Sequence, residues 1–187
     1  MVRIPMLALG VVLMLGLAAC GPGLKAPVPP DGGKVVVSVV FDYGITEDTE
    51  AEKAKQLTQV GDYFAADLKK RFDKNGYVIE TLEAADQFTP GPNKFLLTVK
   101  VLSYNPGAKG ARVAGALLGG YAGMAMANAA EARLAASYRL TGESGKLAGG
   151  ELNEGSGSSD WPAAVQKVSL LILKGSAKAI QGVYKKK

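Results

Sequence analysis

The chain has 187 residues, enough for one domain with a sizeable core. It carries 22 Lys and Arg against 17 Asp and Glu, a formal net charge of +5, and it contains no histidine. The lack of histidine excludes zinc sites built on His and every triad that uses His as its base, and the spread-out charges lack the basic, aromatic-rich stripe of a nucleic-acid-binding surface.

The N-terminal apolar stretch ends on the only cysteine of the chain. It follows Arg3, the only early charge, and closes with Leu17-Ala18-Ala19 directly before Cys20. A charged start, an apolar core and a small-residue cleavage site are the anatomy of a secretory signal. The Leu-Ala-Ala-Cys ending resembles a lipobox, so we expect residues 1–19 to be a lipoprotein signal peptide and Cys20 to carry lipid. The alternative is a membrane-spanning helix, for which about 16 apolar residues are short.

The segment after the cysteine is rich in proline and glycine. Residues 21–33 read GPGLKAPVPPDGG, a composition that forms neither a helix nor a central strand. We expect residues 20–33 to be the lipidated cysteine and a tether of roughly 40 Å, at about 3.1 Å per extended residue. Residue 21 is Gly rather than Asp, the residue that resembles an inner-membrane retention signal in known lipoproteins. This predicts sorting to the inner leaflet of the outer membrane.

The first half of the remaining chain predicts a strand, a helix and two further strands. The strand at 35–41 is β-branched and apolar on both faces, and a short strand follows the helix at 77–80. Alternation over 94–104 predicts a half-exposed strand. The helix ends at Asn75-Gly76. Its apolar side chains recur at steps of three and four: Leu57, Val60, Phe64, Leu68 and Phe72.

The second half predicts a hairpin and a last helix. Residues 133–140 alternate between apolar and polar, and a turn at 142–145 leads into a weaker strand at 146–152. Ser159 or Asp160 can cap the helix, whose apolar face we expect to hold Val165, Val168, Ile172, Ala179 and Val183. The order predicts an α/β (α+β) fold in residues 34–187. We expect a single periplasmic domain, with one mixed β-sheet and two helices packed on one face, plus a glycine-rich helical or loop segment.

The glycine-rich segment allows two interpretations. Residues 113–130 carry no charge, and Gly115, Gly119 and Gly123 are four residues apart. On a helix these glycines share one face and let another backbone come close. In the first interpretation the segment packs on its own domain. In the second, residues 111–127 form a glycine zipper that self-associates or contacts a membrane. A span is disfavoured because 18 residues are the lower limit and most are Gly or Ala.

The sequence patterns that resemble phosphate-binding or calcium-binding motifs are incomplete. Gly142 to Lys146 resembles the end of a phosphate loop, but the positions that need Gly and Ser or Thr hold Leu140 and Leu147. The acids from Glu47 to Glu52 lack the ligand pattern of a calcium loop. We therefore expect no enzyme activity, no catalytic residues, no metal site and no cofactor.

Several motifs resemble those of a family of bacterial envelope lipoproteins, the domain of unknown function four-four-one-zero. They are Gly110-Ala111-Arg112, the glycines from Gly115 to Gly123, and Arg139-Leu140 followed by Ser144-Gly145-Lys146. The resemblance runs from Lys34 to about Ile180. It departs near Gly142, where an aspartate often precedes the turn, and in a longer stretch before the strand. It implies a small α/β envelope domain and brings no catalytic residues.

These features together predict a lipoprotein of the bacterial envelope. We expect an outer-membrane anchor at Cys20, a periplasm-facing domain, and a non-enzymatic binding or accessory role. The partner would be another envelope protein or a second copy of the chain, and not nucleic acid. The alternative is a membrane-active or self-assembling subunit that uses Gly115, Gly119 and Gly123.

Overall fold

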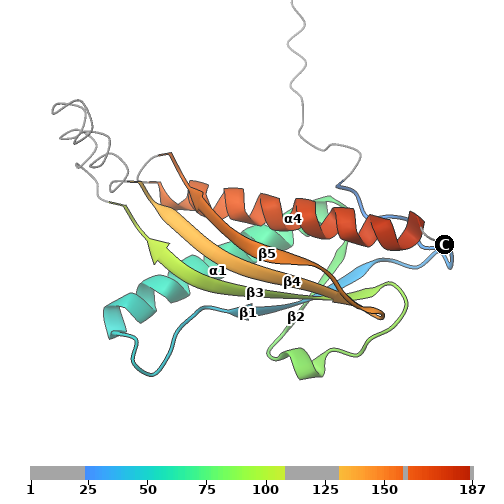
Figure 1. Ribbon diagram of the computed structural model, residues 1–187, viewed down its shortest axis with the longest axis horizontal. Coiled ribbons are helices and arrows are strands. Elements are labelled where there is room, and N and C mark those ends of the chain that lie inside the picture. The colour runs from blue at the N-terminus through green and yellow to red at the C-terminus, as the bar shows by residue number, and fades with distance from the viewer. Residues whose placement is uncertain (1–23, 108–130, 158–159, 186–187) are drawn as a thin grey trace, which may run out of the picture.

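The computed structural model describes residues 24–107, 131–157 and 160–185. Two long helices lie on the same side of one twisted sheet (Figure 1). In chain order the elements are β1 (Val36–Asp42), α1 (Ala51–Lys74), β2 (Val78–Leu82), a short 3₁₀ turn (Ala85–Gln87), β3 (Lys94–Asn105), β4 (Arg133–Gly142), β5 (Gly145–Gly155) and α4 (Trp161–Lys185). The predicted α+β class, with one mixed sheet and both helices on one face, is confirmed.

The sheet has the order β2-β1-β3-β4-β5. Strand β1 is parallel to both β2 and β3, whereas β3–β4 and β4–β5 are antiparallel. Parallel neighbours need a crossover, and α1 supplies it between β1 and β2. The register of β3 and β4 shifts between Val101 and Ser103, and Leu102 at this irregularity is 44% exposed.

The core lies between the sheet and the two helices. Every second residue of β3 is buried, from Phe95 to Val101, and Leu134, Ala136 and Leu140 continue this layer on β4. The five apolar residues expected to form the α1 stripe are all buried, at 5% exposure or less. The three- and four-residue period had indicated this face, because such positions share one side of a helix.

The buried face of α4 differs in part from the expected one. Val165, Val168 and Ile172 are buried as predicted, but Ala179 and Val183 are only partly buried. Further along the helix, Ala177 and Ile180 are completely buried instead. The apolar surface of this helix is wide enough to allow either choice, so contact with β4, β5 and α1 decides which residues face inward.

The N-terminal stretch, residues 24–33, differs from the expected free tether. The Ala26 N–H donates to the Asn75 carbonyl at 2.8 Å, and the Gln181 amide donates to the Lys25 carbonyl at 3.0 Å. Leu24 and Ala26 pack against the core, and Pro29 is buried. Proline excludes helix and central strand, but it leaves an extended chain free to pack along a helix end. Residues 20–23 therefore remain between the expected anchor and the first described contacts.

Candidate functional site

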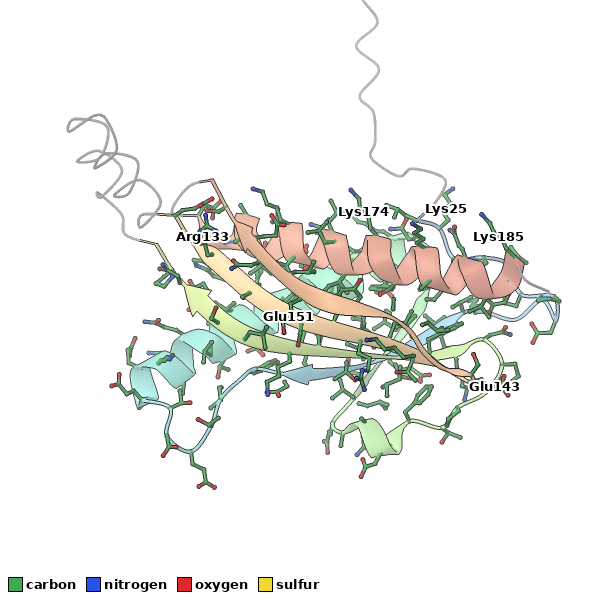
Figure 2. The ribbon with its side chains drawn as sticks, in the orientation of Figure 1. Lys25, Arg133, Glu143, Glu151, Lys174 and Lys185 are labelled. Atoms are coloured by element: carbon green, nitrogen blue, oxygen red, sulfur yellow. The ribbon has the colours of Figure 1, made fainter. Side chains whose placement is uncertain are left out.

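One end of the sheet carries the turn between β4 and β5. Figure 2 shows Glu143 in this turn and Arg133 at the other end of β4. The start of β3, the last turns of α4 and the N-terminal stretch meet at the Glu143 end. The sequence had indicated a hairpin turn here, but it did not indicate that three distant segments converge on it.

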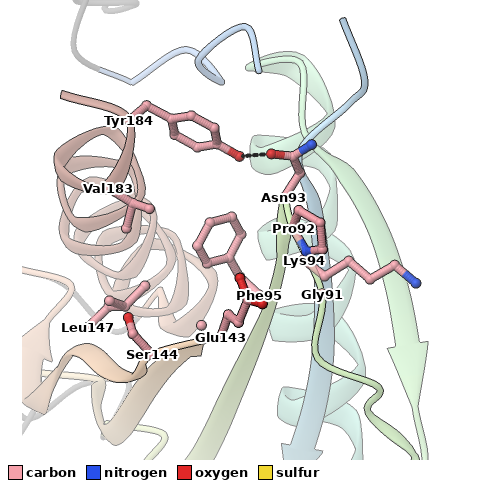
Figure 3. Close-up of a pocket in the computed structure, with 11 residues that line it drawn as sticks. Gly91, Pro92, Asn93, Lys94, Phe95, Glu143, Ser144, Leu147, Val183 and Tyr184 are labelled. Atoms are coloured by element: carbon pink, nitrogen blue, oxygen red, sulfur yellow. Dashed lines mark hydrogen bonds between the residues drawn. The ribbon is translucent and has the colours of Figure 1, made fainter. Parts of the chain in front are cut away.

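A pocket of about 290 Å³ lies at this end, between β3, the β4–β5 turn and the last turn of α4 (Figure 3). Phe95, Leu147 and Val183 supply apolar side chains to its wall. Tyr184 and Ser144 add hydroxyl groups at its edge, and the Lys94 side chain points away from Tyr184 in Figure 3. Ligand pockets typically hold about 300–1,000 Å³, so this one lies at the lower end of that range and suits a small group.

Asn93 joins the pocket to the N-terminal stretch. Its amide nitrogen donates to both carboxylate oxygens of Asp31, at 3.1 and 2.9 Å, and its amide oxygen accepts a hydrogen bond from the Tyr184 hydroxyl at 2.6 Å. Its backbone has φ 63°, a left-handed conformation that Asn tolerates better than most residues. The two side-chain contacts therefore hold one rim of the pocket in a single arrangement.

The Tyr184 hydroxyl remains a proton donor over a wide pH range. Burial raises its pKa above the ordinary value of tyrosine, and the negative charge of Asp31 raises it further. Both effects disfavour the phenolate, which would repel the carboxylate and lose its hydrogen bond to Asn93. The Asp31–Asn93–Tyr184 contact is consequently a structural support of the rim.

The pocket floor is closely packed beneath the turn. A Cβ atom added at Gly142 would lie 2.9 Å from Leu147 Cδ1 and 3.3 Å from Phe95 Cδ1. These distances are shorter than normal contacts, so a side chain at residue 142 would push on both apolar residues. The glycine in the rejected phosphate-loop pattern thus has a packing role beside the pocket.

The site residues expected from the sequence are not among the residues that the structure describes. Cys20, Gly115, Gly119 and Gly123 all fall outside the described residues. The pocket residues were missed because they come from three separate segments, within 91–95, 142–147 and 183–184. The sequence did contain one local indication of the pocket, since the Gly91-Pro92-Asn93 loop and the Gly142–Gly145 turn both break regular structure.

Within the described part of the chain, no helix is sufficiently long and apolar to span a membrane.

Of the comparisons with known proteins, only the comparison with solved structures finds similar proteins. No protein family matches the chain, and no curated protein matches it. Similar solved structures include the PelC dodecamer from Paraburkholderia phytofirmans, with 14% identity, a TM-score of 0.39, and coverage of 84% of this chain and 93% of that chain. Another is protein XCC0632 from Xanthomonas campestris, with 9% identity, a TM-score of 0.43, and coverage of 83% and 90%. Both TM-scores lie below 0.5, so the likeness assigns neither a family nor a function.

Proposed function

We propose that this chain is a lipoprotein anchored in the outer membrane through Cys20, with a periplasm-facing, non-enzymatic domain that binds another envelope component. Membership of the resembled lipoprotein family is part of the same proposal. The observation that carries the binding role is the pocket between Phe95, Leu147 and Val183, which has apolar walls and hydroxyl groups at its edge.

The size and chemistry of the pocket favour one kind of ligand. A cavity of about 290 Å³ accommodates a single apolar side chain presented by a partner protein. The exposed Ser144 hydroxyl can hydrogen-bond the partner's main chain around it. Such an arrangement resembles the centre of a protein interface, where a buried anchor residue fills a pocket and polar groups surround it.

The position of the N-terminal stretch supports the anchoring role. Asp31 of this stretch holds Asn93 on the pocket rim, and Lys25 is bonded to Gln181 near the end of α4. A lipid on Cys20 would therefore hold this end of the domain near the membrane, because residues 20–23 extend at most about 14 Å. The pocket would then face partners at or near the outer membrane.

The anchor is tested with Cys20→Ser in the full chain. Wild type should incorporate radiolabelled palmitate and sediment with outer membranes, whereas the Cys20→Ser chain should take up no label and accumulate as an uncleaved or soluble form. Equal labelling and equal fractionation of the two chains would contradict the lipoprotein assignment.

The pocket is tested with a photo-crosslinking amino acid in cells. Benzoylphenylalanine at Ser144 lies in the turn that lines the pocket, and the same residue at Ser103 is a matched control, because Ser103 is exposed near the other end of β3. We expect a light-dependent adduct from Ser144 alone. Equal adducts at both positions, or none at Ser144, would contradict binding at this pocket.

The alternative function, self-assembly through residues 111–127, depends on a segment outside the described residues and stays a prediction from the sequence.

A further inference from the structure

The exposed side of α4 carries a line of lysines. Residues on a helix advance by about 100° each, so Lys174, Lys178 and Lys185 fall within about 40° of one another. All three are exposed, and the helix contains no Asp or Glu between Trp161 and Lys185. The same helix buries Val168, Ile172 and others on its opposite side. The result is a cationic surface that is separate from the packed face.

Lys25 extends this line from another segment. Its carbonyl accepts the bond from Gln181, which lies on the same side of α4 between Lys178 and Lys185. Figure 2 shows Lys25, Lys174 and Lys185 along the same edge of the molecule, away from the face of the sheet that the helices leave uncovered. We call Lys25, Lys174, Lys178 and Lys185 the lysine face.

The lysine face forms no ion pair with the described part of the protein. The ion pairs among the described residues join Arg71 to Asp67, Lys100 to Asp42, and Arg133 to Glu131. None of them uses a residue of the lysine face. Lys167 also lies on this side of α4, but it donates to the Gly155 carbonyl and lies near Glu131, so it is not included.

We propose that the lysine face is the surface with which the domain lies against anionic phospholipid headgroups. Its charge is complementary to such a membrane, and Lys25 is only five residues after Cys20. This placement rests on the proposed lipid anchor, because an anchored Cys20 brings Lys25 close to the bilayer. A single lipid chain and a basic patch reinforce each other in membrane binding.

The proposal gives the anchored domain an orientation. With α4 toward the membrane, the face of the sheet opposite the helices points away from it. That face carries Lys100, paired with Asp42 at 2.9 Å, and Arg139. A freely rotating domain on a long tether would have no such preference.

The test uses the chain that begins at Gly21, which lacks both the signal and the lipidated cysteine. This chain retains every described contact, since all of them lie within residues 24–185. Its binding to vesicles of phosphatidylcholine with one quarter phosphatidylglycerol is measured by co-sedimentation at low salt. Vesicles of phosphatidylcholine alone serve as the uncharged reference.

We expect binding to the anionic vesicles alone, and its loss at high salt because screening weakens exposed charges. Each lysine near an anionic surface contributes about a fivefold gain in affinity, so Lys174→Glu/Lys178→Glu should weaken binding roughly 25-fold or more. The matched control is Lys53→Glu/Lys55→Glu, which makes the same change of net charge at exposed positions near the start of α1. This control variant should weaken binding several-fold less than Lys174→Glu/Lys178→Glu does.

Two results would overturn the proposal. One is the absence of binding to anionic vesicles, and the other is an equal loss in the two double variants, which would mean that net charge alone acts. The assay is independent of the anchor, because this chain has no Cys20. Failure of palmitate labelling would therefore refute the lipoprotein assignment, while the vesicle result would separately decide the lysine face.

Discussion

Two helical glycines should respond differently to the same substitution. Gly61 in α1 faces the ring of Tyr43, and a Cβ atom added there would lie 2.6 Å from Cδ1 and 2.8 Å from Cε1. Gly182 in α4 has nothing within 4 Å of its added Cβ. Neither glycine has a positive φ. The backbone thus permits alanine at both positions, and only the surroundings differ.

The expected magnitudes follow from these surroundings. Alanine stabilises a helix interior by about 1 kcal/mol relative to glycine, so Gly182→Ala should raise the free energy of unfolding by about 0.5–1 kcal/mol. Gly61→Ala gains the same propensity but forces the Tyr43 ring aside at a cost of about 1–3 kcal/mol. The ring cannot move freely, because the Tyr43 hydroxyl donates to Asp62 at 2.8 Å. Gly61→Ala should therefore be neutral or destabilising by up to about 2 kcal/mol.

Urea unfolding followed by far-UV circular dichroism measures both changes, provided that the dependence on urea concentration stays constant. Tyr43→Ala supplies the control, because removing the ring should let Gly61→Ala stabilise the chain by about 1 kcal/mol in that background. A Gly61→Ala chain as stable as the Gly182→Ala chain, with Tyr43 present, would refute the reasoning.

Three further predictions concern the core, the N-terminal stretch and alkaline pH. Leu68→Ala should cost about 2–5 kcal/mol because Leu68 is 1% exposed, whereas Leu102→Ala, at 44% exposure, should cost less than about 1 kcal/mol in the same urea assay. A chain that begins at Lys34 should melt below one that begins at Gly21, since it loses the contacts of residues 24–33, and equal melting temperatures would show that these contacts contribute nothing. Burial, followed by the charge of a neighbouring tyrosine, raises the pKa of Tyr77 to about 12. Between about pH 10 and 12 the unfolded chain loses this proton while the folded chain keeps it, so stability should fall as pH rises, and Tyr77→Phe should reduce that slope.

Local periodicity in the sequence was sufficient for the elements and for much of the core. The three- and four-residue steps of α1 and the alternation of β3 mark which side chains turn the same way, because helix and strand geometry place them on one face. Asn75-Gly76 likewise marked the end of α1, where Asn75 Nδ2 donates to the Arg71 carbonyl at 2.8 Å. The layered α+β arrangement followed from these faces, since each needs apolar contact with another element.

Contacts between residues far apart in the chain decided the strand order, the packing of the N-terminal stretch and the pocket. The strand order β2-β1-β3-β4-β5 and the packing of residues 24–33 on the domain depend on pairing partners far apart in the chain. The pocket exists only because Asn93, Leu147 and Tyr184 come together at one end of the sheet. No local sequence pattern predicts these long-range contacts, because periodicity shows which face of an element is apolar and not which surface covers it.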